Sequence, residues 1–211
     1  MPTPYIFESR ADLIRDLQAP ATQNLAQSFF ANRAATISDV TCEGVGGNTF
    51  RAFRNLSVRP SIAFRTWTSQ RVTQTLPDIL AATDVISYAA YVHNTTLALV
   101  KYWHECTASE MGYGRGAKLL NLVLKKLACY STLTEKQRTR LVNLLHVPLD
   151  SYTIVGLREV APGLCIPKSA TMKHITTPTQ YTEFQAFITA ITKRAGVPPI
   201  YYDILAWDRA H

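Results

Sequence analysis

The sequence predicts an all-α protein, and three observations support this class. Long segments carry apolar residues at intervals of three and four, the repeat of a helix that buries one face. Several of these segments open on Thr, Ser or Asp and close near Pro or Gly, as helices do. Only the stretch from Thr41 to Arg71 lacks this periodicity and is rich in Gly and Arg, so we expect loops and a short hairpin there.

The elements follow in chain order. Two N-terminal helices are predicted over 10–18 and 21–34, with an interruption at Pro20. Helical periodicity resumes over 76–91 and continues through 95–105. Residues 112–116, Gly-Tyr-Gly-Arg-Gly, predict a glycine-rich turn, and residues 117–128 predict a strong helix after it.

The remaining helices are marked by their first residues. Thr134-Glu-Lys-Gln137 has the form of a capping box and predicts a helix through residue 145, which Pro148 ends. Asp150 or Ser151 then caps another helix. The last two helices are predicted over 181–194 and 202–209, with a break at residues 196–199, Gly-Val-Pro-Pro.

Composition restricts the class of protein and of partner. The 211 residues are 47% hydrophobic and 18% charged, which excludes extended disorder and favours a packed globular chain. A net charge of +7 favours a polyanionic partner. No run of eighteen apolar residues and no signal-peptide pattern is visible, so we expect a cytoplasmic protein without a membrane partner. The four cysteines form no Cys-x-x-Cys pair, which argues against a zinc site or a disulfide framework.

The glycine-rich turn and the residues after it suggest contact with phosphate. A turn of the form Gly114-Arg-Gly-Ala-Lys118 directs backbone N–H groups outward at the start of a helix, which suits a phosphate oxygen. Arg115 adds a positive charge at the tip. Such contacts position DNA without reading its sequence, so we expect Gly114, Arg115 and Gly116 to bind the DNA backbone.

The order of these motifs resembles the helix-hairpin-helix DNA glycosylases. The family has a Gly-x-Gly hairpin, a helix, and a Val-Pro-hydrophobic-Asp turn with a catalytic aspartate; here these are Gly114-Arg-Gly116 and Val147-Pro-Leu-Asp150. Members that also cleave the abasic strand carry a lysine where this chain has Lys118. The resemblance implies one unit over 1–211, with two helical subdomains and an active-site cleft between them. One subdomain would hold about 1–40 and 160–211, and the other about 75–158.

Within that family, the archaeal 8-oxoguanine glycosylase branch is the most similar. Lys118 and Asp150 are thirty-two residues apart, and that branch has a similarly long spacing. It also has an Asp and a Trp that touch the extruded base near the C-terminus, matched here by Asp203 and Trp207. The branch has an aromatic residue four positions after the lysine, where this chain has Leu122. The first hundred residues resemble no family that we can name.

The expected chemistry follows from the residue types. Breaking an N-glycosidic bond builds positive charge on the sugar, and a carboxylate at a helix N-terminus, as Asp150 would be, is held in its charged form. Lys118, as a free amine, would attack C1′ and form a Schiff base that permits strand cleavage. Trp207 and Tyr113 would stack on the flipped base.

Weaker candidates lie in the Arg-rich stretch. Its arginines alternate with aromatic residues, a pattern typical of segments that grip DNA, and we single out Arg51, Arg54 and Trp67. A solvated basic face is an equally good interpretation. Each main residue also has a purely structural explanation: Asp150 as an ordinary N-cap, Lys118 as a surface lysine, and Trp207 as a core residue. Their joint order favours the functional interpretation.

The sequence therefore predicts a monomeric DNA glycosylase acting on double-stranded DNA with a modified base, with or without lyase activity. Two substrate classes stay open: oxidised guanine, as in repair, and hypermodified or glucosylated cytosine of phage DNA, as in antiviral defence. No cofactor is expected, although the resemblance allows a monovalent cation at the hairpin when DNA is bound. The alternative functions are a non-enzymatic helix-hairpin-helix DNA-binding protein and a basic interaction protein without DNA affinity.

Overall fold

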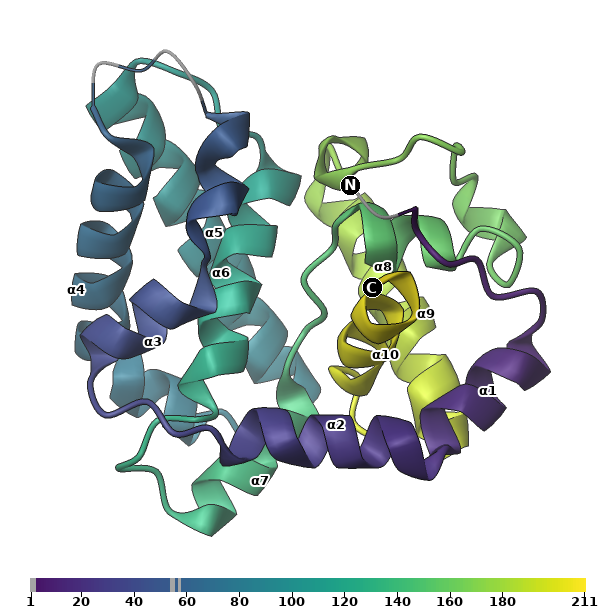
Figure 1. The fold of residues 1–211 in the computed structure, drawn as a ribbon. Helices are drawn as coiled ribbons and strands as arrows, with labels where there is room; N and C mark the ends of the chain where they lie inside the picture. The colour runs from purple at the N-terminus through teal and green to yellow at the C-terminus, as the bar shows by residue number, and fades with distance from the viewer. Residues whose placement is uncertain (1–2, 54–55, 57) are drawn as a thin grey trace.

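The computed structural model describes residues 3–53, 56 and 58–211, and helices joined by loops make up its fold (Figure 1). In chain order the α-helices are α1 (Arg10–Gln18), α2 (Pro20–Ala31), α3 (Ile37–Gly44), α4 (Pro60–Ala81), α5 (Val85–Thr107), α6 (Tyr113–Leu127), α7 (Glu135–Leu144), α8 (Ser151–Gly156), α9 (Pro178–Ala195) and α10 (Tyr201–Ala210). Short 3-10 helices lie at Gly47–Ala52, Pro162–Leu164 and Met172–His174. Over the described residues there is no strand, and Ala34 and Tyr130 form an isolated bridge. The all-α prediction is confirmed.

Side chains that the sequence marks as caps begin several helices. The Thr134 hydroxyl accepts a hydrogen bond from the Gln137 N–H, and the Gln137 side-chain oxygen accepts one from the Thr134 N–H. The predicted capping box is therefore present. Asp150 caps α8 in the same manner, with Thr153 as its partner. Pro20 does not merely interrupt a helix; it occupies the first turn of α2, where a missing N–H costs nothing.

The prediction of loops and a hairpin over residues 41–71 is wrong for most of its length. Helix α3 reaches Gly44, and α4 begins at Pro60, sixteen residues before the predicted start at Leu76. The buried face of α4 repeats at helical spacing, but two of its five members, Thr68 and Thr75, are threonines, so hydropathy hides the repeat. A break lies at 82–84, where Asp84 caps α5, and α5 then continues through residue 107, as the helical pattern over 95–105 predicts.

The predicted glycine-rich turn at 112–116 is shorter than expected. Gly112 alone lies outside the helix, with a φ of 73° that favours glycine. Gly114 and Gly116 already belong to the first turns of α6, whose start receives no side-chain cap. A Cβ on Gly114 would lie 2.5 Å from the Met172 carbonyl oxygen, so this glycine is required for the loop at 172–175 to approach α6.

The helices pack as two groups, and their arrangement positions the candidate site. Helix α6 packs against α3 and α5, and α4 packs against the same two helices. Helices α1, α2, α8 and α9 each contact α10. Figure 1 shows the segment between α7 and α8 running between these two groups, with α2 crossing below them. No helix in the described part of the chain has the length and apolar character needed to cross a membrane.

Candidate active site

The structure brings Lys118 and Asp150 together. Lys118 lies on α6 in one group of helices, and Asp150 precedes α8 in the other. The Lys118 Nζ is 3.3 Å from the Asp150 Oδ2, and the two side chains are only 14% and 9% exposed. The sequence-predicted pair is therefore a nearly buried ion pair between two segments that the sequence separates by thirty-two positions.

The two oxygens of the Asp150 carboxylate contact different partners. Oδ1 accepts hydrogen bonds from the backbone N–H groups of Tyr152 (2.9 Å) and Thr153 (3.2 Å), while Oδ2 faces Lys118. The Thr153 hydroxyl accepts from the Asp150 N–H and donates to the Pro148 carbonyl oxygen. This cap fixes the carboxylate, and the helix N-terminus favours its negative charge.

A second lysine on the same helix face makes a second pair. The Lys125 Nζ is 2.6 Å from the Asp203 Oδ2 on α10, and Asp203 is almost fully buried. Burial raises the pKa of Asp203, and the negative charge of Asp150 raises it further. The positive charge of Lys125 lowers this pKa but does not cancel the rise. The Asp203 Oδ1 has no hydrogen-bond partner among the described residues. The candidate site therefore holds two amines and two carboxylates in electrostatic contact.

Sequence reasoning missed Lys125, although a signal was available. Lys118, Leu122 and Lys125 recur at intervals of four and three on α6, and all three stay partly exposed while their neighbours on the helix are buried. The partner of Lys125 could not be found in this manner, because Asp203 is seventy-eight positions away.

Trp207 lies one turn after Asp203 and is 45% exposed. The His211 ring covers one face of the indole, with ring centroids 4.2 Å apart and planes within 4° of parallel. Tyr152, two residues after Asp150, contacts both rings. The structure thus places Trp207 as an exposed stacking surface attached to α8 through Tyr152, and not as a core residue.

Tyr113 lies away from these two ion pairs. Its hydroxyl is 3.2 Å from the His93 Nδ1, and its ring packs edge-on against Tyr181. Burial raises the pKa of Tyr113 to about 12. It lines a cavity of about 450 Å³ between α5 and α9, whose described lining contains neither Lys118 nor Asp150. The geometry does not bring Tyr113 to the candidate site.

The predicted DNA-backbone residues lie at the start of α6. The hollow beside Gly112, Gly114 and Arg115 is about 340 Å³, and Lys173 lines it from the facing loop. The Arg115 guanidinium lies 5.6 Å from the centre of the Phe53 ring, so it packs against the aromatic ring as well as facing solvent. Gly116 lies on the opposite side of the helix, where a Cβ would meet Val100 of α5 at 3.1 Å.

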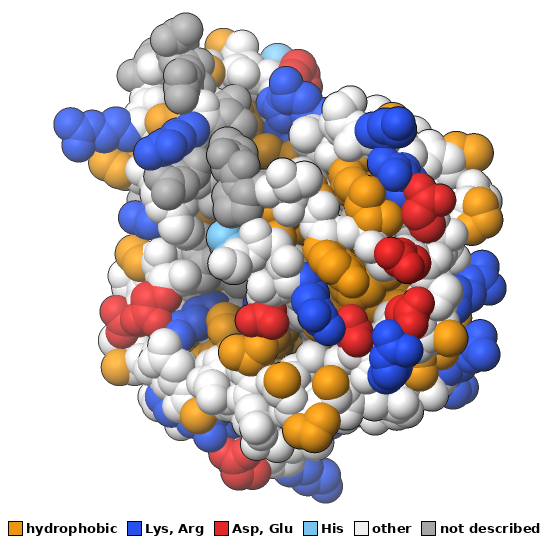
Figure 2. Space-filling model, turned by 45° about the vertical axis from the view of Figure 1, so that its right-hand side comes forward, with side chains coloured by type: hydrophobic (Ala, Val, Ile, Leu, Met, Phe, Trp, Pro, Cys, Tyr) orange, Lys and Arg blue, Asp and Glu red, His pale blue; other side chains and the backbone are white. Residues whose placement is uncertain are grey.

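The residues of the Arg-rich stretch, which the sequence suggested for contact with DNA, differ in how exposed they are. Its aromatic residues Phe50, Phe53 and Phe64 are buried in the core, and so cannot grip DNA. Trp67 is partly buried and stacks on Tyr102 at 5.7 Å. Arg51 is exposed within the 3-10 helix Gly47–Ala52, and Arg54 lies outside the described residues. Figure 2, in which the right-hand side of Figure 1 comes forward, shows Lys and Arg side chains spread among acidic and hydrophobic ones over the face in view.

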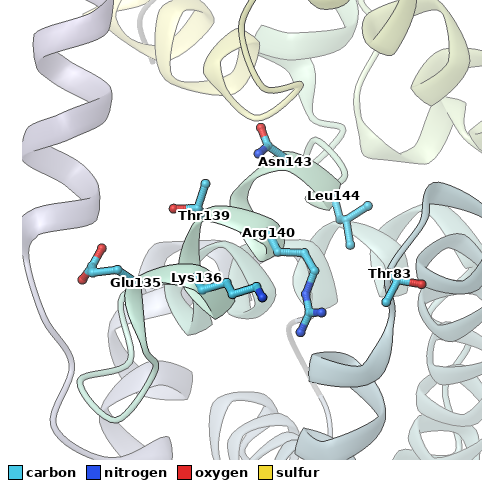
Figure 3. A pocket seen from close by; sticks show the side chains of 7 residues that line it. All are labelled: Thr83, Glu135, Lys136, Thr139, Arg140, Asn143 and Leu144. Carbon is cyan, nitrogen blue, oxygen red and sulfur yellow. The ribbon is translucent and has the colours of Figure 1, made fainter.

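A pocket of about 550 Å³ lies on the outer side of α7 (Figure 3). Lys136 and Arg140 project from the same side of α7, and Arg140 donates to the Leu80 carbonyl oxygen at the end of α4. The described lining of this pocket contains no member of either ion pair, and the Arg140 bond links α7 to the end of α4. In the part of the chain that the structure describes, no group of three His, Cys, Asp or Glu side chains could hold a metal ion.

The two ion pairs define what the site can do. An amine next to a fixed carboxylate can attack an electron-poor carbon while the carboxylate stabilises positive charge beside it. The neighbouring Lys125–Asp203 pair supplies both a hydrogen-bond donor and an unpartnered acceptor to a polar ring. Comparison of the chain with known proteins found no matching family model, no matching curated protein and no matching solved structure.

Proposed function

We propose that this protein is a DNA glycosylase of the helix-hairpin-helix type, which flips out a modified base and breaks its N-glycosidic bond. The observation that carries the proposal is the 3.3 Å approach of the Lys118 amine to the Asp150 carboxylate across two groups of helices. The net charge of +7 supports a polyanionic substrate. The fold and two-subdomain arrangement of the family belong to the same proposal.

The reaction uses both groups. The base departs with the electron pair of the glycosidic bond and takes a proton from the Lys118 ammonium, while the Asp150 carboxylate stabilises the positive sugar. The Lys118 amine then forms a bond to C1′. Breaking the C1′–O4′ bond, with a proton delivered to O4′, gives the Schiff base. Loss of a proton from C2′ then breaks the C3′–O bond and cleaves the strand.

The base would be held by the second pair and by Trp207. Extraction from the helix costs a few kcal/mol, which stacking on an aromatic face recovers. The indole of Trp207 offers such a face once His211 moves aside. Asp203 and Lys125 would bond the base edge, since a carboxylate accepts and an ammonium donates. Leu122 adds an aliphatic surface, and both oxidised guanine and hypermodified cytosine stay candidates.

The test is incubation with duplexes that each carry one modified base, followed by alkali to cleave abasic sites. Release of oxidised guanine would support a repair role, and release of glucosylated cytosine a defence role. Borohydride trapping of a covalent protein–DNA complex would assign the lyase step to a Schiff base. Release of no base from any duplex would remove the enzyme proposal.

The ion pair itself favours one second candidate. The Lys118–Asp150 ion pair is nearly buried between the two groups of helices. An ion pair in this position can also serve only to join the two groups, without taking part in a reaction. In that case the protein is a non-enzymatic DNA-binding module. Its DNA affinity would fall with salt and survive Asp150→Asn and Lys118→Gln, with no abasic product from the native chain.

A further inference from the structure

A cavity of about 450 Å³ opens between α5 and α9, apart from the two ion pairs. Its volume is in the range of small-molecule sites. Small or apolar residues of the two helices form part of its walls, among them Ala89 on α5 and Ala186 on α9. The rings of Tyr113 and Tyr181 lie at one end, where planar molecules could stack.

The floor of this cavity contains a hydrogen-bond donor whose direction can be worked out. The Asn121 amide donates to the Tyr181 hydroxyl oxygen at 2.7 Å, and the same oxygen is 2.9 Å from the His146 Nδ1. Burial raises the pKa of Tyr181, so its hydroxyl keeps its proton. The side chains of Asn121 and Gln185 both act as hydrogen-bond donors to the Tyr181 hydroxyl, which fills both lone pairs of its oxygen, so that proton is donated to His146 Nδ1. His146 must then carry its own proton on Nε2.

The Nε2–H group of His146 is available to a ligand. It has no hydrogen-bond partner in the described part of the chain, and the side chain lines the cavity. Burial lowers the pKa of His146 to about 4, so the ring is a neutral donor at pH 7. Gln185 cannot replace it, because its amide oxygen accepts from the Val147 N–H, and its amide nitrogen donates to the Val147 carbonyl oxygen and to the Tyr181 hydroxyl. The floor therefore selects a hydrogen-bond acceptor, such as a ring carbonyl.

Charge is confined to the other end of the cavity. Lys193 lies twelve positions after Tyr181 on α9, about 18 Å along the helix axis between the two backbone positions, and its flexible four-carbon side chain can shorten the distance that a ligand must span. Its side chain is exposed, and no acidic residue is among the described residues that line the cavity. A ligand that fills this space would place a planar ring on the floor and an anionic group toward Lys193.

We propose that this cavity is a second ligand site, for a mononucleotide whose base carbonyl accepts from His146 and whose phosphate faces Lys193. This site is separate from the proposed glycosylase chemistry and does not depend on it. The probe is guanosine 5′-monophosphate, titrated into the full chain by calorimetry, with guanosine and inorganic phosphate as comparisons. We expect the nucleotide to bind, guanosine to bind about ten-fold more weakly, and phosphate alone not to bind.

Matched variants locate the site. Ala186→Trp fills the cavity from an exposed position and should abolish binding, whereas Glu183→Trp, also exposed on α9 but absent from the cavity lining, should not. Lys193→Ala should weaken the nucleotide about ten-fold and leave guanosine unchanged, while its exposed neighbour Arg194→Ala changes neither. Thermal melting shows that each variant is folded.

Three outcomes overturn the inference. Absence of nucleotide binding at millimolar concentration removes the site. Binding that survives Ala186→Trp, or that is lost in Asp150→Asn, would place the nucleotide elsewhere, in the second case at the glycosylase site. Since Asp150 lies outside the cavity lining, the failure of one proposal is distinguishable from the failure of the other.

Discussion

Lys118 and Asp150 form an ion pair in which each residue is fixed by a different helix. The lysine is carried by the long helix α6, and the aspartate is held by two backbone N–H groups at the start of α8. A buried pair of this kind is weak evidence for stability, because desolvation offsets the attraction between the charges. It is better evidence for a site that needs an amine and a carboxylate at one point.

Asp150→Asn should reduce base release by about a hundred-fold or more, because the neutral amide no longer stabilises positive charge on the sugar. Asparagine is also a good helix cap, so α8 should stay folded. Single-turnover release from a modified duplex measures the rate.

Asp84→Asn is the matched control for this substitution. Asp84 caps α5 through the same kind of hydrogen bonds, to the N–H groups of Ile86 and Ser87, but lies in the exposed start of that helix. It should release base at the native rate. An Asp150→Asn variant with native activity would show that the carboxylate takes no part in the reaction.

Lys118→Gln should lose strand cleavage and borohydride trapping, because the amide cannot form a Schiff base. Lys125→Gln should keep the ability to be trapped while its base release slows. Lys101→Gln, at an exposed position on α5, is the control with native behaviour. Gel analysis of trapped complexes separates the three variants. Native base release by Lys118→Gln would make the enzyme monofunctional, with water as the attacking group.

Lys125→Met should destabilise the fold by about 3–5 kcal/mol, because it leaves the buried Asp203 carboxylate without its charged partner. The double variant Lys125→Met/Asp203→Leu should recover most of that loss. Arg209→Met breaks the more exposed pair with Asp16 and should cost about 1 kcal/mol or less. Urea denaturation gives each free energy of unfolding. Equal costs for the two single variants would contradict the buried-pair interpretation.

Gly114→Ala should cost roughly 3 kcal/mol, since the new methyl group would overlap the carbonyl oxygens of Met172 and Ile175. Gly46→Ala is the control, because a Cβ there would meet no atom of the described residues within 4 Å. The comparison uses thermal melting. An unchanged stability for Gly114→Ala would mean that the loop at 172–175 does not lie against α6.

The titration of His146 should make stability depend on pH. Its pKa is about 4 in the folded chain against 6.5 in the unfolded chain, so between these values the unfolded state binds the additional proton. The free energy of unfolding therefore falls as pH drops from 6.5 to 4, by about 3 kcal/mol at most. His146→Gln keeps an acceptor for Tyr181 but does not titrate, and should show a smaller fall in urea denaturation across this range. Identical pH profiles would refute the assignment.

The sequence correctly predicted the helix caps whose residues lie within a few positions of one another. The capping box at Thr134 and the cap at Asp150 each depend on residues within three positions, and both are present. The first part of helix α4 was missed because two threonines form part of its buried face and hide the apolar repeat. The glycines at 114 and 116 predicted a turn, yet they permit close packing of α6 against a loop and against α5.

The sequence by itself determined the helical class, the cap at Asp150 and the register that places Lys118 and Lys125 on one face of a helix, because each depends on neighbours along the chain. Only the tertiary structure decided that Asp203 meets Lys125, that Tyr113 lies in the cavity between α5 and α9, and that His211 covers Trp207. Those contacts join positions far apart in sequence or depend on side-chain orientation, and their geometry is set by how whole helices pack.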